Sequence, residues 1–146
     1  MIRGNDMDSI EELRKKLLSL SGNVAHVVPY GMGNICEKLL KEGIYFNDPT
    51  VITLDNQKAG LCHNNSINVW ADNIDELKIC TGYAIDDNVW YRHTWCIDIQ
   101  GVIYECTPYK RGAYYGLPLD LQESKQFISE ILYPNEIEEI RSKITK

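Results

Sequence analysis

The sequence predicts an α+β fold, a single domain over residues 1–146 in which an antiparallel sheet has a helix packed on one face. Two observations predict this class. Strand-forming stretches alternate with turn residues between positions 77 and 107, which indicates consecutive antiparallel strands. Apolar residues recur at helical spacing towards both ends of the chain, and 146 residues are enough for one domain with a sizeable core.

The N-terminal part of the chain is expected to contain two helices and one short strand. The first helix should start at Ser9, because Ser9-Ile10-Glu11-Glu12 has the pattern of a capping box, and should end at Gly22. A strand from Val24 to Val28 follows, and its His26 is interpreted as structural because it lies in an apolar run. The second helix should cover about Asn34 to Lys41.

The middle of the chain is expected to be a long, loop-rich segment that leads to one helix. Residues Tyr45 to Ala59 should be rich in loops, with a short strand at Val51 to Leu54. A helix should then begin at Cys62 and end at Asp72-Asn73.

The three central strands are predicted from β-branched and aromatic residues. The first runs from Leu77 to Ala84, and its Gly82 indicates a bulge or the close approach of another backbone. A turn at Asp86-Asp87-Asn88 leads into a hairpin from Val89 to Thr107.

The turn of this hairpin predicts its register. Asp98 suits the first position of a type I turn and Gly101 suits a left-handed residue, which together give a three-residue loop with a bulge. The expected pairs are Asp98 with Val102, Ile97 with Ile103 and Trp95 with Glu105. His93 would then share a face with Glu105, one diagonal step away, whereas a two-residue loop would put them on opposite faces.

The C-terminal part combines a tyrosine-rich segment with two helices. Thr107 to Gly116 is expected to be a loop that either lines a substrate cleft or packs on the surface. Helices are expected from Leu121 to Leu132 and from Pro134 onward, the second with Ile137, Ile140 and Ile144 on one stripe.

The predicted start of the central helix makes Cys62 a candidate nucleophile. The N–H groups and dipole at a helix N-terminus stabilise a thiolate and lower the pKa of a cysteine placed there. His93 and Glu105 follow in the order of a thiol hydrolase triad, in which a carboxylate orients the histidine that activates the thiol.

Four short motifs in this order resemble the catalytic layout of the transglutaminase-like and papain-like cysteine hydrolases, above all small uncharacterised bacterial and phage proteins of that kind. The motifs are Cys62-His63-Asn64-Asn65, Gly82-Tyr83-Ala84, His93-Thr94-Trp95 and Glu105-Cys106-Thr107. The resemblance covers about half the chain and implies a papain-like or transglutaminase-like core. Many members of the family have Asp as the third triad residue, where this chain has Glu105.

Further residues are expected to complete the site. Gln57 precedes Cys62 as the oxyanion-hole glutamine of papain-like enzymes does, although the Cys62 N–H is the safer donor, and Gln57 is otherwise a solvated loop amide. The resemblance makes Asn65 a support residue. Substrate-binding candidates are Trp95, Tyr109, Arg111, Tyr114 and Tyr115.

The function predicted from these residues is that of a thiol-dependent hydrolase or acyl-transferase acting on an amide, with no cofactor. The alternative is a non-catalytic module that binds a protein partner through residues 107–116. A metal site built from cysteine and histidine is disfavoured, because the chain has no Cys-x-x-Cys or His-x-x-x-His spacing.

Composition restricts the partners and the compartment. The net charge of −6 without a basic cluster argues against nucleic acid and favours a protein or small amide substrate. No membrane-spanning stretch and no signal peptide are visible, and the odd count of five cysteines favours reduced thiols in a cytoplasm. Cys96 and Cys106 are close across the predicted hairpin, either as a disulfide or as two small buried apolar side chains.

Overall fold

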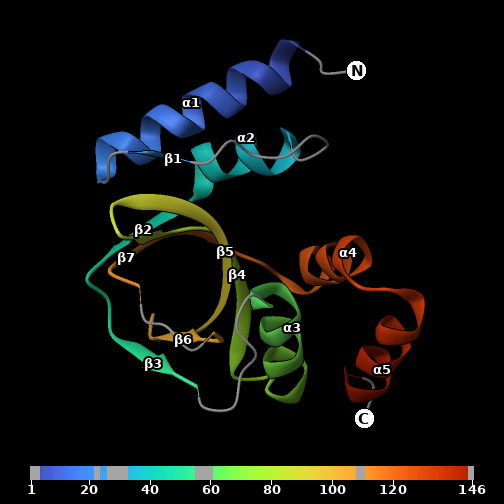
Figure 1. The fold of residues 1–146 in the computed structure, drawn as a ribbon. Helices are drawn as coiled ribbons and strands as arrows, with labels where there is room; N and C mark the ends of the chain where they lie inside the picture. The colour runs from blue at the N-terminus through green and yellow to red at the C-terminus, as the bar shows by residue number, and fades with distance from the viewer. Residues whose placement is uncertain (1–3, 22–23, 26–32, 55–60, 108–110, 145–146) are drawn as a thin grey trace. The chain divides into compact units, whose positions relative to one another are not determined.

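A computed structural model describes residues 4–21, 24–25, 33–54, 61–107 and 111–144 (Figure 1). The predicted α+β class is confirmed. The helices are α1 (Gly4–Leu20), α2 (Gly33–Glu42), α3 (Cys62–Asp72), α4 (Leu121–Ile131) and α5 (Pro134–Ile144). The strands are β1 (Val24–Ala25), β2 (Ile44–Asn47), β3 (Val51–Thr53), β4 (Leu77–Asp86), β5 (Val89–Asp98), β6 (Ile103–Glu105) and β7 (Ala113–Pro118). Among the helices described, none has both the length and the apolar character needed to cross a membrane.

The sheet is mixed, which corrects the expected antiparallel one. Its hydrogen-bonded order is β2-β7-β4-β5-β6-β3, with β1 paired to β5. The β1–β5 and β3–β6 pairs are parallel. Turn residues identify strands that follow one another in the chain, whereas these parallel partners are joined by long connections that leave no local signal.

The helix bounds agree with the sequence for α2 to α5 but not for α1. Helix α1 begins at Gly4, and Ser9 is a buried residue inside it, so the expected start at Ser9 is wrong. The capping box instead occurs at α4, where the side chain of Asp120 accepts from the Glu123 backbone N–H and the Glu123 side chain accepts from the Asp120 N–H. A four-residue motif specifies a possible cap, and the surrounding packing decides whether the helix starts there.

The described residues divide into two compact units. The first comprises Met1–Asp48, Gly82–His93 and Arg111–Leu117, and the second comprises Pro49–Thr81, Thr94–Lys110 and Pro118–Lys146. Strands β4 and β5 contribute residues to both units.

In the first unit, helices α1 and α2 pack together through buried leucines such as Leu13, Leu17 and Leu39. Strand β2 pairs antiparallel with β7, and the Tyr115 hydroxyl donates to the Leu39 carbonyl oxygen. Gly82 lies against β7, because a Cβ atom there would be 2.1 Å from the Tyr115 carbonyl oxygen. This confirms the predicted close backbone approach at Gly82.

In the second unit, the β5–β6 register confirms the prediction from the turn. Ile97 pairs with Ile103 and Cys96 with Tyr104, in the expected register, and the expected pair of Trp95 with Glu105 stays a prediction. The Asp98 N–H donates to the Val102 carbonyl at 3.2 Å, and Gly101 has a φ of +85°. The three-residue loop with a left-handed glycine therefore forms as expected.

Helix α3 lies against the end of β5 that belongs to the second unit. The Cys96 thiol on β5 donates to the Ser66 carbonyl oxygen of α3 at 3.3 Å. Ile67 and Trp70 of α3 are buried, and the helix also contacts α4 and α5. Helix α3 is thus supported by a strand and by two helices of its own unit.

Candidate active site at the start of helix α3

Cys62 is the first residue of α3, where the sequence predicted the helix to begin. None of the five cysteines forms a disulfide, and Cys62 is the one that is partly exposed while the other four are buried. The residue before it, Leu61, has a side chain that accepts no hydrogen bond, so the N-cap position provides no side-chain acceptor for the first-turn N–H groups. These groups are suited to stabilising a thiolate or an oxyanion beside Cys62.

The next residue, His63, ties the first turn of α3 to strand β5. Its Nδ1 lies 2.6 Å from the Thr94 hydroxyl, which in turn lies 2.8 Å from the Thr81 hydroxyl of β4. The His63 ring also meets the ring of Phe127 on α4 edge to face, with 5.6 Å between the centroids. His63 therefore has a positioning role that the sequence did not indicate.

Two further side chains of α3 complete this attachment. The Ser66 hydroxyl donates to the Thr94 carbonyl at 3.1 Å. The Asn65 side-chain amide donates to the Cys106 carbonyl at 2.8 Å and is buried. The motif that begins with Cys62 is therefore bonded to the residues that directly follow His93 and Glu105 in the sequence.

Glu105 is the last residue of β6 and is fully buried. Its Oε2 accepts a hydrogen bond of 2.9 Å from the Thr107 hydroxyl. Because a buried carboxylate is costly without hydrogen bonds, this bond explains the Thr in the Glu105-Cys106-Thr107 motif.

His93 lies on the β5 segment of the first unit and is almost fully buried. Its ring centroid is 6.3 Å from that of Tyr114, and its backbone carbonyl accepts from Arg92 at 3.1 Å. Cys62 and Glu105 belong to the second unit. The triad of Cys62, His93 and Glu105 therefore stays a prediction.

The expected tyrosine-rich loop is in part a strand. Residues 113–116 belong to β7, so the loop prediction is wrong for them, and Tyr114 and Tyr115 are buried. The reason is their pairing with β2, a strand that the sequence analysis did not identify. Arg111 forms an ion pair of 2.9 Å with Asp86.

The remaining candidates differ in where they lie. Trp95 is fully buried on β5. Gln57 and Tyr109 lie outside the described residues, as does His26. The roles of Trp95 and Tyr109 in substrate binding and of Gln57 in the oxyanion hole stay predictions. The structural role of His26 also stays a prediction.

The other cysteines of the second unit form a buried group of thiols. Cys96 and Cys106 are free, which corresponds to the two small buried side chains considered above rather than to a disulfide. Burial raises the pKa of Cys80 well above its usual value. The contact with Cys106, together with burial, also raises the pKa of Cys96. Within the described ranges, no three Cys, His, Asp or Glu side chains are grouped so that they could hold a metal ion.

Three supporting residues were not identified from the sequence, namely Ser66, Thr94 and Thr107. Each lies within or beside a motif quoted for the resemblance, and each makes a hydrogen bond described above. Strand alternation was a usable signal for Thr94, because a residue between His93 and Trp95 must point to the opposite face of β5.

Comparisons with protein-family models, with curated proteins and with solved structures gave no match to this chain.

Proposed function

We propose that the protein is a thiol-dependent hydrolase or acyl-transferase with a papain-like or transglutaminase-like core. Cys62 acts as the nucleophile, His93 as the general base and acid, and Glu105 as the carboxylate that orients His93. The substrate is an amide of a protein or of a small molecule. Five cysteines without a disulfide suit a reducing compartment such as the cytoplasm.

One observation carries this proposal. The residues that follow Cys62 are bonded to Thr94 and Cys106, which directly follow the other two members of the triad in the chain. Such bonds are what a catalytic site needs from its supporting residues, because they limit the motion of the helix that carries the nucleophile.

The hairpin register gives independent support. Cys96 pairs with Tyr104, and continuing this register by one residue puts Glu105 opposite Trp95. Alternation along β5 then predicts that His93, two residues before Trp95, shares the face of Trp95. A histidine and a carboxylate in this diagonal relation form the orienting half of a nucleophilic site.

The proposed reaction has two steps. His93 takes the proton of the Cys62 thiol, and the sulfur attacks the carbonyl carbon while N–H groups at the start of α3 stabilise the oxyanion. His93 then gives this proton to the leaving amine as the C–N bond breaks, and the acyl group stays on the sulfur as a thioester. Water or a second amine then attacks the thioester carbonyl while His93 takes a proton from this nucleophile. The C–S bond breaks, the acyl group passes to the nucleophile, and His93 returns the proton to the Cys62 sulfur. Water gives hydrolysis, and an amine gives transamidation.

The proposal is tested with p-nitrophenyl acetate, a general acyl donor. We expect a burst of p-nitrophenolate and an acetyl group on Cys62, located by peptide mass spectrometry. Cys62→Ala should remove the burst and His93→Asn should slow acylation by at least about a hundredfold, the usual contribution of a general base. Cys36→Ala, which alters a buried cysteine of the first unit, is the matched control and should keep the burst.

A full burst in Cys62→Ala, or acetylation spread over several cysteines, would contradict the assignment of the nucleophile. Normal acylation in His93→Asn would remove His93 from the mechanism while leaving Cys62 a reactive thiol. Circular dichroism of each variant shows whether a loss of activity comes from unfolding.

The alternative of a non-catalytic module that binds a partner through residues 107–116 has less support. Two of its tyrosines, Tyr114 and Tyr115, are buried in β7 and leave little of the expected aromatic contact surface.

A further inference from the structure

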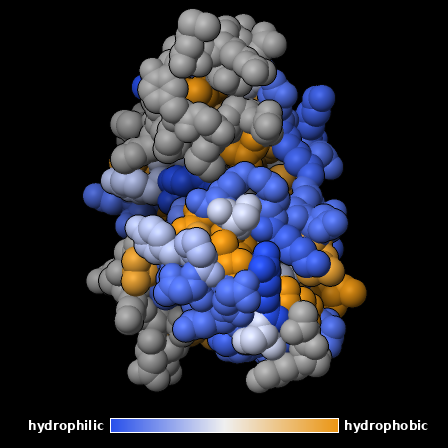
Figure 2. Space-filling model, turned by 90° about the vertical axis from the view of Figure 1, so that its right-hand side faces the viewer, coloured by the Kyte–Doolittle hydropathy of each residue, from blue (hydrophilic) through white to orange (hydrophobic). Residues whose placement is uncertain are grey.

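The apolar stripe of helix α5 is only partly covered. Ile140 is buried, but Ile137 and Ile144 keep an intermediate exposure. Together with Ile128 of α4 they line a cavity of about 390 Å³ in the second unit. Figure 2 faces the side of the molecule that carries α4 and α5 in Figure 1, and it shows apolar surface between hydrophilic side chains there.

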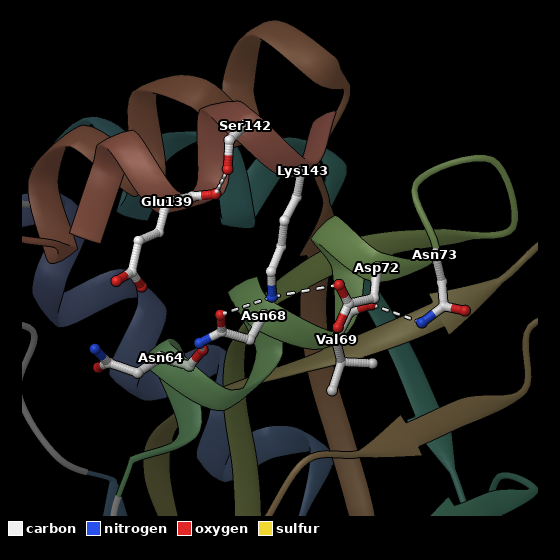
Figure 3. Close-up of polar contacts among 8 residues, drawn as sticks. All are labelled: Asn64, Asn68, Val69, Asp72, Asn73, Glu139, Ser142 and Lys143. Atoms are coloured by element: carbon white, nitrogen blue, oxygen red, sulfur yellow. Dashed lines mark hydrogen bonds and ion pairs between the residues drawn. The ribbon is translucent and has the colours of Figure 1, made fainter. Parts of the chain in front are cut away.

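Both helices that form this cavity are also attached to α3. Phe127 of α4 packs on His63, as described above. Lys143 of α5 points down to α3, with its Nζ 3.3 Å from Asp72 Oδ1 and 3.5 Å from Asn68 Oδ1 (Figure 3).

The charged side chains that line the cavity are both cationic. Lys125 comes from α4 and Arg141 from α5, and no Asp or Glu is among the lining residues. A second cavity of the same unit has a mixed lining, with Asp75, Asp120 and Lys78. Arg141 also forms an exposed ion pair of 2.8 Å with Glu138, so Lys125 is the more accessible of the two charges.

We propose that the cavity between α4 and α5 binds the free carboxylate of a single-chain amphiphile, a medium-chain fatty acid. The isoleucines accommodate the hydrocarbon chain, and Lys125 and Arg141 at the rim attract the carboxylate. The volume lies in the range of pockets that hold small ligands, and it suits one chain rather than the two chains of a membrane lipid. The occupant would remove apolar surface of α5 from water.

Calorimetric titration with sodium decanoate, below the concentration at which it forms micelles, tests the proposal. We expect one decanoate per chain and an increase in Tm with ligand concentration. Decan-1-ol and decyltrimethylammonium have the same chain without the negative charge, and both should bind more weakly than decanoate by about two- to fivefold or more, the usual contribution of an exposed ion pair.

Three variants locate the site. Ile137→Phe fills the cavity and should weaken decanoate binding by at least about tenfold, because the phenyl ring occupies the space that the hydrocarbon chain needs. Lys125→Gln should weaken it by about two- to fivefold, and Lys15→Gln, an equal change of charge on the exposed side of α1, should leave it unchanged. Ser129→Phe, which fills the cavity from an exposed position, replaces Ile137→Phe if that variant does not fold.

Equal affinity for decanoate and decan-1-ol, or unchanged binding in a folded variant with the cavity filled, would overturn the proposal. Binding of many decanoate molecules per chain would also overturn it, because it indicates detergent-like adsorption. Cys62→Ala should bind decanoate like the unmodified protein, so this experiment and the acylation experiment fail independently.

Discussion

At the scale of single residues, the hydroxyl of Thr107 donates a hydrogen bond to the buried side chain of Glu105. Thr107→Val keeps the shape of the side chain and removes its hydrogen bond of 2.9 Å to the carboxylate. We expect a loss of about 1.5–3 kcal/mol in the free energy of unfolding, the usual contribution of a hydrogen bond to a charged group, measured by urea denaturation. Thr53→Val on exposed β3 is the control and should change stability by less than about 0.5 kcal/mol. Equal effects of the two substitutions would show that the Thr107 hydroxyl does not support Glu105.

At the scale of secondary-structure elements, the β5–β6 turn determines which residues face each other across the hairpin. Asp98 Oδ1 accepts from the N–H groups of Gln100 and Val102 at 2.9 and 3.0 Å, and its Oδ2 accepts from the Tyr104 hydroxyl at 3.2 Å. Asp98→Ala removes all three acceptors, and we expect it to lower the free energy of unfolding by about 1–3 kcal/mol. Gln100→Ala keeps its N–H group and should cost less than about 0.5 kcal/mol. Urea denaturation of both variants checks this, and equal stabilities would contradict the assigned role of the Asp98 side chain.

At the scale of the whole molecule, buried thiols and phenols make stability depend on pH. Burial raises the pKa of the Cys80 thiol and of the Tyr83 phenol. The unfolded chain therefore releases protons at a lower pH than the folded chain. Stability is fully present below the unfolded pKa of about 8.5 for a thiol, and we expect it to fall above that pH by about 1.4 kcal/mol per pH unit for each such thiol.

The measurement is urea denaturation of the unmodified protein and of Cys80→Ala at pH 7.5 and at pH 10. Cys80→Ala should lose less stability between the two values, by about 1.4–2 kcal/mol, because it lacks one titrating group. Ile79→Val, a loss of packing next to Cys80 on β4, should lower stability equally at both values. The same pH dependence in Cys80→Ala and in the unmodified protein would show that Cys80 ionises when the chain is folded as readily as when it is unfolded.

The sequence by itself determined the local features of this protein. The helix that begins at Cys62, the turn at Asp98 and the pairing of Ile97 with Ile103 could all be predicted, because each depends on side chains a few residues apart. The candidate nucleophile and the carboxylate Glu105 belong to these features and were found for the same reason.

Only the tertiary structure decided the rest. The start of α1, the pairing of β2 with β7 and the parallel partners of β5 and β6 depend on segments that are distant in the chain. Distant segments also form the hydrogen bonds from α3 to Thr94 and Cys106. The cavity between α4 and α5 likewise depends on how these two helices pack. A sequence pattern reports which face of an element is apolar, but which partner covers that face, and how completely, is decided by the packing of the folded chain.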